Sequence, residues 1–220
     1  MNFTVGNTKV NKEDMNMQEL ESRLPEVKQG GQHSPDLCIA QEKVAIIFPY
    51  RNREMNLRVM LRNLHPFLIR QGRDYKIYVI EQSEKGAFNR GKLFNIGYDI
   101  AKKENYTCFI FHDIDLIPEN DYNIYKCESN PIHYTVAIDK FKYKLLYDTN
   151  FGGVVGMTSE QFQQTNGYSN MYEGWGSEDD DLYVRVIKSN MKIMRKSTKI
   201  ARYTALKHSP FEINVNTIIK

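Results

Sequence analysis

The sequence predicts an α/β fold, because strand-like and helix-like segments alternate along its first half. Three short runs are apolar and rich in β-branched or aromatic residues, as buried strands are: Val44–Pro49, Tyr75–Gln82 and Tyr106–Phe111. Between them, apolar residues recur at helical spacing from Leu57 to Leu68 and over Leu93–Ile100. A strand-helix-strand-helix-strand order is that of half of a nucleotide-binding sheet covered by helices.

The remainder of the chain is less regular. Residues 1–35 are polar, without sustained periodicity, and are predicted to be a stem or linker before a domain that spans residues 36–220. Further strands are predicted at Tyr134–Ile138, Gly152–Met157 and Ile200–Leu206. Thr158 and Gln161 form a capping-type helix start, and Asn166–Ser177 is rich in turn residues, which favours a long loop.

Composition limits the class of protein. With 220 residues, of which 41% are hydrophobic, the chain is long enough for one domain with a real core. Its formal net charge is +3 and it has no dense run of lysine and arginine, which argues against a nucleic-acid partner. No apolar run approaches the roughly 18 residues that a membrane-spanning helix needs, and the first residues lack the pattern of a signal peptide.

An acidic motif, Asp113-Ile114-Asp115, follows the third predicted strand. It stands at the carboxyl end of that strand, where open α/β sheets bind their ligands. Alternation along an extended chain would put Asp113 and Asp115 on the same side. Two carboxylates so placed suit a hard divalent cation, Mg²⁺ or Mn²⁺, that also takes diphosphate oxygens. The alternative interpretation is a polar turn after a strand.

A second acidic cluster, Glu178–Asp181, follows a turn in which the chain's only tryptophan, Trp175, stands between two glycines. One interpretation is a solvated helix start, because Asp and Glu favour the first turn of a helix. Apolar residues recur at helical spacing after Glu178, so a helix is predicted to begin there. The other interpretation is a sugar-binding wall, in which a flat indole lies beside strong acceptors. The tryptophan favours the second interpretation.

Basic and aromatic residues follow the first two predicted strands. Arg51 and Arg53 come after the first, and arginine suits phosphate because its planar fork donates two parallel hydrogen bonds. Phe88-Asn89-Arg90 offers an aromatic face beside a cation, a combination that would suit uracil and ribose or phosphate. Exposed surface arginines are the alternative interpretation. The chain contains no GxGxxG or Walker loop, so a nucleotide is not held in those ways.

Together these motifs resemble the β-1,4-galactosyltransferase family. The resembling segments, in the order that the family has them, are FPYRNR (Phe48–Arg53), FNRGKLFNIGY (Phe88–Tyr98), HDIDLIPEND (His112–Asp121), FGGV (Phe151–Val154) and NGYSNMYEGWGSEDDD (Asn166–Asp181). HDIDLIPEND and ARYTALKH (Ala201–His208) are more similar to the invertebrate N-acetylgalactosaminyltransferase branch. The resemblance implies a GT-A-type fold, a Rossmann-like mixed sheet flanked by helices.

The resemblance also implies an activity. It is the inverting, Mn²⁺-dependent transfer of Gal or GalNAc, from UDP-Gal or UDP-GalNAc, to the 4-hydroxyl of a GlcNAc-terminated acceptor. By resemblance the catalytic residues are Asp179, the base, and Glu178, which orients the acceptor, while Asp115 and His208 hold the metal. The donor-binding residues are Pro49, Tyr50, Arg51, Asn52, Arg53, Phe88, Asn89, Arg90, Asp113, Ile114, Asp115, Lys140, Asn150, Trp175 and His208. The acceptor-binding residues are Tyr147, Gly153, Trp175, Ser177, Glu178, Asp179 and Asp180.

The chain departs from the family pattern in three places. Ala205 stands where mammalian galactosyltransferases have a methionine metal ligand, so weaker metal binding is expected. Asn150 replaces the tyrosine of the galactose-specific enzymes and leaves room for an N-acetyl group, so we expect UDP-GalNAc to be used at least as well as UDP-Gal. The sequence ends 12 residues after His208, so the catalytic domain is expected to be short at its C-terminus.

These departures leave other functions open. A truncated pseudoenzyme would bind UDP or a glycan without turnover, which Ala205 and the short C-terminus favour. The intact acidic motifs and Trp175 favour catalysis instead. A related enzymatic alternative, a xyloside galactosyltransferase, would have a second histidine at the position of Pro210, so the sequence argues against it.

The resemblance also bears on the cysteines and the compartment. Cys108 and Cys127 match a family disulfide, and Cys38 matches a cysteine whose partner this chain lacks, so Cys38 is expected to be free. Reduced cytosolic thiols are the alternative. Family members are type II Golgi proteins, so we expect a Golgi-lumenal or secreted protein. Sequons at Asn2 and Asn105 fit a lumenal address.

Overall fold

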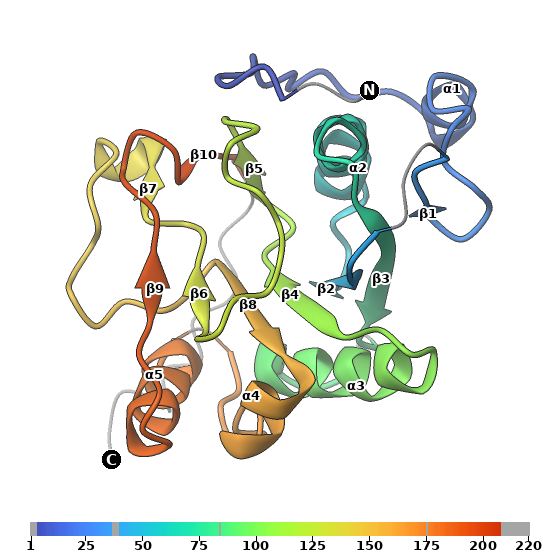
Figure 1. Ribbon diagram of the computed structural model, residues 1–220. Coiled ribbons are helices and arrows are strands. Elements are labelled where there is room, and N and C mark those ends of the chain that lie inside the picture. The colour runs from blue at the N-terminus through green and yellow to red at the C-terminus, as the bar shows by residue number, and fades with distance from the viewer. Residues whose placement is uncertain (1–3, 37–39, 84, 175, 208–220) are drawn as a thin grey trace.

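The centre of the fold is a seven-stranded mixed sheet in the order β1-β3-β2-β4-β8-β6-β9 (Figure 1). The computed structural model describes residues 4–36, 40–83, 85–174 and 176–207, and the predictions for Cys38, Trp175 and His208 lie outside them. The strands of this sheet are β1 Gln32–His33, β2 Lys43–Tyr50, β3 Asp74–Glu81, β4 Cys108–His112, β6 Ile132–His133, β8 Val154–Thr158 and β9 Met194–Arg195. A three-stranded sheet combines β5 Leu116–Pro118, β10 Arg202–Ala205 and β7 Ala137–Ile138.

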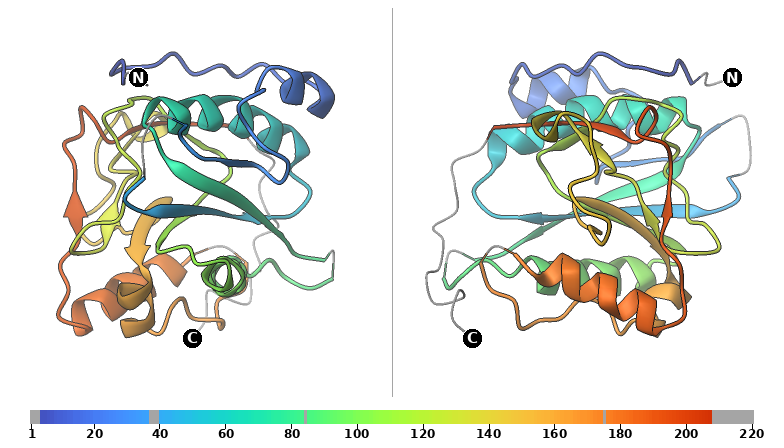
Figure 2. Two further views of the ribbon diagram at one scale, coloured as in Figure 1. Left: turned by 45° about the vertical axis from the view of Figure 1, so that its right-hand side comes forward. Right: turned by 90° about the vertical axis from the view of Figure 1, so that its left-hand side faces the viewer.

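Helices cover both faces of the large sheet. They are α1 Met17–Ser22, α2 Glu54–Arg70, α3 Arg90–Lys103, α4 Ser159–Gln164 and α5 Glu178–Lys188, with a 3-10 turn, η1, at Asp139–Phe141. Figures 1 and 2 show α2 and the N-terminal segment on one face, and α3, α4 and α5 on the other. β2 runs parallel to both β3 and β4, whereas β4 and β8 are antiparallel. The carboxyl ends of β2 and β4 therefore meet at one edge of the sheet, where the site is found.

Two apolar cores hold these layers together, one on each face of the sheet. Successive side chains of a strand point to opposite faces, so Ile46 packs toward α2 while Ile47 packs toward α3. Both residues are fully buried. A strand covered on both faces has a continuous apolar sequence, not an alternating one, and this explains the run VAIIFP.

The structure confirms the strands and helices predicted in the first half to within about two residues at each strand end. It also confirms the capping box at Thr158 and Gln161, and α5 begins at Glu178 as predicted. The N-terminal segment is more structured than its lack of periodicity indicated, because it contains α1 and because β1 pairs with β3. The boundary between stem and domain stays a prediction.

The predicted strand at Tyr134–Ile138 is correct only at its end, where Ala137–Ile138 forms β7, and residues 134–136 are not a strand. That segment carries the chain from β6 in the large sheet to β7 in the small one. Side-chain hydrogen bonds stabilise the backbone where the chain passes from one sheet to the other. The Tyr134 hydroxyl donates to the carbonyl of Lys126, and the Thr135 hydroxyl donates to the carbonyl of Gly152. The strand predicted from Gly152 begins only at Val154, since Gly153 has a φ of +78°, outside the β region.

A disulfide joins Cys108 and Cys127, as predicted, with their Cα atoms 5.4 Å apart. It links the start of β4 to the end of the segment that carries Asp113 and Asp115, and so it closes a loop around the acidic motif. Among the residues that the structure describes, no helix combines the length and the apolar character that crossing a bilayer requires.

Candidate active site

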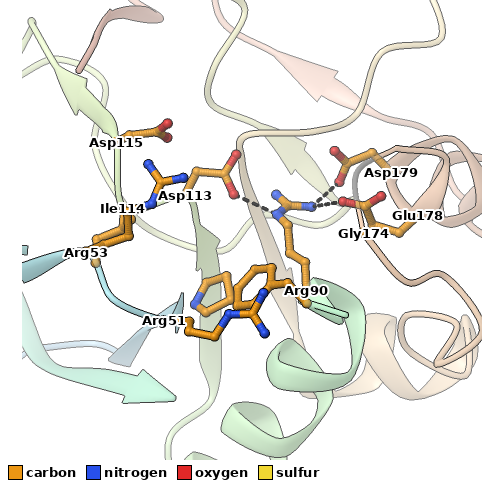
Figure 3. Close-up of a pocket in the computed structure, with 11 residues that line it drawn as sticks. Arg51, Arg53, Arg90, Asp113, Ile114, Asp115, Gly174, Glu178 and Asp179 are labelled. Carbon is orange, nitrogen blue, oxygen red and sulfur yellow. Dashed lines mark hydrogen bonds and ion pairs between the residues drawn. The ribbon is translucent and has the colours of Figure 1, made fainter. Parts of the chain in front are cut away.

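A cavity lies at the sheet edge where β2 and β4 end, and we call it the arginine cavity. It is lined by Pro49, Arg51, Arg53, Phe88, Arg90, Asp113, Ile114, Asp115, Gly174, Glu178 and Asp179 (Figure 3). The cavity encloses about 140 Å³. Residues from the motifs after β2, before α3, after β4 and at the start of α5 thus meet in one place, although they are far apart in the sequence.

The aromatic and cationic residues of the arginine cavity contact one another. The guanidinium of Arg51 lies over the ring of Phe88, 5.3 Å from its centroid, and donates to the carbonyl of Gly86 at 2.9 Å. A flat ring beside a fixed cation can hold a nucleobase by stacking and a phosphate by charge. The geometry therefore fits the nucleotide cradle that the sequence predicted at Phe88.

A larger cleft adjoins the arginine cavity on the side of the irregular loops, and we call it the loop cleft. It encloses about 600 Å³ and shares Asp113, Glu178 and Asp179 with the arginine cavity. Its other walls include Thr135, Lys140, Leu146, Tyr147, Asn150, Gly152, Gly153, Ser177 and Asp180. All the predicted acceptor-binding residues that the structure describes lie in this cleft.

Arg90 joins the two acidic motifs at the boundary between the two spaces. Its Nε donates to Asp113 at 2.7 Å, and its Nη1 donates to Asp179 at 2.6 Å and to Glu178 at 3.1 Å, as Figure 3 shows. The side chain of Arg90 is only 12% exposed. Burying three carboxylates is costly unless a cation compensates them, and Arg90 is that cation. Sequence reasoning assigned it only to the donor.

Asp179 has the electrostatics of a base that operates near neutral pH. Its removal from water raises its pKa to about 7, opposed by Arg90 and assisted by the charge of Glu178. Asp113 is shifted in the same direction, because burial raises its pKa while Arg90 opposes the shift. Burial is thus the largest cause of the raised pKa of Asp179, and the charge of Glu178 is a smaller one.

The four acids of α5 divide into separate roles. Glu178 and Asp179 bind Arg90, while Asp180 accepts a hydrogen bond from the Tyr147 hydroxyl at 2.9 Å. Asp181 pairs with Arg185 one turn further along the helix. The segment is therefore a helix start, as one interpretation of the sequence held, and its acids Glu178 and Asp179 also line the two cavities. The sugar-binding role of this segment stays a prediction.

The glycines of the FGG segment make room for Asp179. A methyl group on Gly152 would overlap the Asp179 carboxylate, so only glycine allows this close approach. A methyl group on Gly153 would come within 2.7 Å of the Thr135 hydroxyl oxygen, in a backbone conformation that L residues rarely adopt. The glycine pair is the only sequence signal for a close contact here, and nothing in the sequence identified Asp179 and Thr135 as the residues that the glycines contact.

The end of β10 lies against the backbone of Asp115. Ala205 is paired with Leu116, and the backbone N–H of Leu206 donates to the carbonyl of Asp115 at 2.8 Å. The chain that leads to His208 therefore passes beside the predicted metal ligand Asp115, although His208 itself lies outside the described residues. Ile114 and Asp115 lie in a turn and not in an extended chain, so strand alternation does not set the position of Asp115 relative to Asp113.

Some predicted donor residues lie elsewhere. Tyr50 ends β2 and is buried, Asn52 has a left-handed backbone, and the Asn89 side chain caps α3 by accepting from Lys92. None of these three lines the arginine cavity. Lys140 and Asn150 line the loop cleft instead. Their assignments to the donor stay predictions.

The chain matches two known family models that together cover most of its length. The N-terminal region of glycosyl transferase group 7 matches residues 1–128, and the N-terminal domain of galactosyltransferase matches residues 132–209. The chain belongs to the β-1,4-galactosyltransferase family. The acidic motif after β4 lies in the first matched region and the acids of α5 lie in the second.

Members of the family are similar over most of this chain. Human beta-1,4-galactosyltransferase 4 is 49% identical over 199 residues, which are 90% of this chain and 58% of the relative. A beta-N-acetyl-D-glucosaminide beta-1,4-N-acetylglucosaminyl-transferase of Lymnaea stagnalis is 48% identical over 200 residues, 90% of this chain and 41% of the relative. The chain thus spans about half the length of these relatives. Two donor specificities match it almost equally, so the branch within the family stays a prediction.

The fold is the GT-A-type fold that the sequence predicted. A mutant of Drosophila beta-1,4-galactosyltransferase 7, solved in complex with manganese, UDP-Gal and xylobiose, superposes with a TM-score of 0.69. It is 29% identical, and the match covers 80% of this chain and 79% of that one.

Polar residues on and behind the wall of the loop cleft were missed by the sequence reasoning. His133, Thr135 and Arg195 all contact the FGG segment or the loop before it. They belong to none of the motifs that carried the resemblance to the galactosyltransferase family. Their only sequence signal is their polar character.

Proposed function

We propose that this protein is an inverting, Mn²⁺-dependent hexosyltransferase of the β-1,4-galactosyltransferase family. It moves Gal or GalNAc from a UDP-sugar to the 4-hydroxyl of a GlcNAc-terminated glycan. The observation that carries the proposal is the position of Asp179: a carboxylate with a raised pKa stands between an arginine-lined cavity and an open cleft. An inverting transfer needs a base between donor and acceptor, on the face opposite the leaving group.

The arginine cavity supports the donor half of this proposal. Uracil would stack on Phe88, while Arg51 and Arg53 would bind the diphosphate through their planar forks. Arg90 and the acids that it bridges would then face the sugar at the boundary with the loop cleft. The acceptor would enter through the cleft, where Tyr147 and Asp180 offer a hydroxyl and a carboxylate.

The proposed chemical step uses Asp179 as the general base. The acceptor 4-hydroxyl gives its proton to Asp179 as its oxygen forms a bond to the anomeric carbon of the sugar. The bond from that carbon to the diphosphate breaks, and UDP leaves with the electron pair. Burial helps because it raises the proton affinity of Asp179, and Arg90 keeps the carboxylate oriented.

The residues near Asp115 fit a manganese ion. Asp115 lines the arginine cavity, and the chain that leads to His208 passes beside its backbone. A carboxylate and an imidazole suit Mn²⁺. Asp115 and His208 would hold the ion, which when bound would offset the charge that grows on the leaving diphosphate.

Asn150 supports the use of a donor with an N-acetyl group. It lines the loop cleft next to Gly152 and Gly153, where a smaller side chain leaves room for a larger sugar substituent. We therefore propose UDP-GalNAc as a donor at least as good as UDP-Gal. Action on a glycan also implies a Golgi-lumenal or secreted enzyme, which agrees with the Cys108–Cys127 disulfide.

The test is a transfer assay on a GlcNAc-terminated oligosaccharide, with UDP-Gal, UDP-GalNAc and UDP-GlcNAc as donors, each with and without Mn²⁺. We expect a β-1,4-linked product that depends on Mn²⁺. Binding of UDP without transfer from any of the three donors would overturn the proposal and favour the pseudoenzyme.

A further inference from the structure

Arg195 lies behind the loop cleft and forms part of neither cavity wall, yet it contacts the backbone of the wall in two places. It stands in β9, paired with His133 of β6. Its Nη2 donates to the carbonyl of Asp148 at 3.0 Å and to that of Asn150 at 2.8 Å. Its Nε donates to Nδ1 of His133 at 3.3 Å. A single planar guanidinium thus holds three acceptors.

The contact with Arg195 determines the tautomer of His133. A guanidinium only donates, so Nδ1 of His133 must be the acceptor and Nε2 must carry the hydrogen. Nε2 then donates to the carbonyl of Gly152 at 2.9 Å. His133 is fully buried, and burial lowers its pKa to about 3, so the ring stays neutral in this arrangement.

The carbonyls that are held in this way belong to the loop that forms the acceptor side of the site. Asp148 and Asn150 follow Tyr147, whose hydroxyl reaches Asp180, and Gly152 packs directly against the Asp179 carboxylate. The Thr135 hydroxyl donates to the same Gly152 carbonyl at 2.8 Å. A shift of this loop would therefore move the acceptor wall and the surroundings of the base together.

We propose that Arg195, acting through His133, is a positioning residue for the acceptor side of the site. The role rests on the proposed function. Arg195 holds the 148–152 loop, so that Tyr147, Asn150 and Asp179 keep their relative geometry. Arg195 lines neither the arginine cavity nor the loop cleft, so its effect on donor binding is small. A displacement of about 1 Å in a positioned group is enough to cost up to about 100-fold in rate.

The test compares matched variants. Arg195→Lys keeps the positive charge but cannot reproduce three directional bonds from one planar group. Arg202→Lys is the control, because Arg202 also lies in a short strand and makes its contacts to Glu119 and Tyr143 away from the cleft. At position 133, His133→Gln keeps a donor that can reach Gly152, whereas His133→Leu removes it.

The readouts separate positioning from general stability. For Arg195→Lys we expect the acceptor kcat/KM to fall about tenfold or more, while UDP binding changes less than about twofold and hydrolysis of the UDP-sugar by water falls less than transfer does. The acceptor kcat/KM of His133→Leu should fall as far as that of Arg195→Lys, and that of His133→Gln should fall less. The acceptor kcat/KM of Arg202→Lys should match that of the wild type. Equal losses in hydrolysis and transfer, or no loss in transfer, would overturn the inference.

A second measurement does not depend on the activity. Hydrogen exchange of the backbone amides in residues 147–154 should be faster in Arg195→Lys than in the wild type, with the rest of the sheet unchanged. If the wild type transfers no sugar, the proposed function fails, while faster exchange confined to this loop would still support the positioning role. Unchanged exchange there would overturn it.

A different observation carries a second inference, which concerns the turn between α3 and β4. The sequon Asn105-Tyr106-Thr107 begins just after the end of α3, and both Asn105 and Thr107 are exposed. Asn105 has a φ of +62°, a left-handed conformation that asparagine tolerates at the end of a helix. The turn precedes β4, so it lies at the opposite end of that strand from Asp113.

We propose that Asn105 carries an N-linked glycan in the native protein. The exposed turn leaves room for the sugar, and the Cys108–Cys127 disulfide agrees with an oxidising compartment, where such glycans are added. The chain, expressed behind a cleavable secretion leader, should shift in mobility when treated with a peptide-N-glycosidase, which hydrolyses the amide bond between asparagine and the glycan. The peptide with Asn105 should then carry aspartate at that position.

Two substitutions at Thr107 test whether the modification depends on the sequon. Thr107→Ser keeps the sequon and should keep the modified peptide, whereas Thr107→Ala removes the sequon and should abolish it. Because Asn105 is remote from both cavities, transfer activity should be the same in the two variants. An unmodified Asn105 peptide in the secreted wild type would overturn this inference and leave the proposed function untouched.

Discussion

The arginine cavity and the loop cleft share a wall, but they are built in different ways. The arginine cavity gathers residues from the ends of β2 and β4 and from the starts of α3 and α5. The loop cleft is formed mainly by the irregular segment between β7 and β8, whose backbone is held by the polar side chains of His133 in β6 and Arg195 in β9. The first is positioned by regular elements, the second by individual hydrogen bonds.

This difference has a functional consequence. Side chains at the ends of packed strands and helices are fixed by the core, so the proposed donor site, which is built from them, would be rigid before a donor arrives. A wall made of loops can vary without disturbing the core, and its shape depends on a few contacts. We therefore expect changes on the donor side to affect binding and stability, and changes on the cleft side to affect acceptor use and selectivity.

The strongest test of the shared wall is Asp179→Asn. We expect it to reduce transfer by about 10²–10⁴-fold, since it removes a positioned base, and to leave UDP binding nearly unchanged. The measurements are acceptor kinetics and UDP titration. Asp181→Asn is the control, because Asp181 pairs with Arg185 and lines neither cavity. Transfer by Asp179→Asn at the wild-type rate would contradict the assignment of the base.

Arg90→Leu tests whether the two regions depend on one cation. It leaves three carboxylates without their partner, so the free energy of unfolding should fall by about 3–5 kcal/mol, measured by urea denaturation. Arg62→Leu is the control, since its partner Glu13 is largely exposed, and it should cost less than about 1 kcal/mol. Equal losses in the two variants would mean that the Arg90 network is not buried in solution.

Asn150→Tyr tests selectivity in the loop cleft. The tyrosine removes the room for an N-acetyl group, so the ratio of kcat/KM for UDP-GalNAc to that for UDP-Gal should fall about 10–200-fold. The Asn150 carbonyl is held by Arg195, so the backbone should stay in place when the side chain changes. A wild-type enzyme that strongly prefers UDP-Gal would refute the argument from side-chain size.

The pH dependence of transfer sharpens the assignment of Asp179. The base must be ionised, and its pKa is raised to about 7, so the rate should fall about tenfold between pH 8 and pH 6. The charge of Glu178 contributes to that raised pKa. Glu178→Gln should therefore shift this acidic limb to lower pH. A flat profile between pH 6 and pH 8, with chemistry rate-limiting, would exclude Asp179 as the group that titrates.

The smallest expected effect concerns the metal. Ala205→Met adds a thioether at the end of β10, beside the backbone that carries Asp115, and should lower the half-saturating Mn²⁺ concentration a few-fold. Ala205→Leu has a similar size without the sulfur and serves as the control. Identical Mn²⁺ titrations for the Met and Leu variants would mean that position 205 does not face the metal.

The sequence alone determined the fold class and most of the arginine cavity. Buried parallel strands produce continuous apolar runs, and ligand-binding residues follow them directly, so Arg51, Arg53 and Asp113 were found from their positions after β2 and β4. The disulfide and the start of α5 were also predicted. These features depend on local pattern or on motifs, which a single sequence retains.

Only the tertiary structure decided how the two acidic motifs are joined and what holds the loop cleft. Arg90 lies 88 residues before Glu178, and Arg195 lies 62 residues after His133, and no local pattern connects such pairs. The segment after Tyr134 was wrongly predicted as one strand, because its path depends on hydrogen bonds to Lys126 and Gly152 outside the segment, which no periodicity indicates. Such contacts form only when packing brings the partners together and burial makes their hydrogen bonds obligatory.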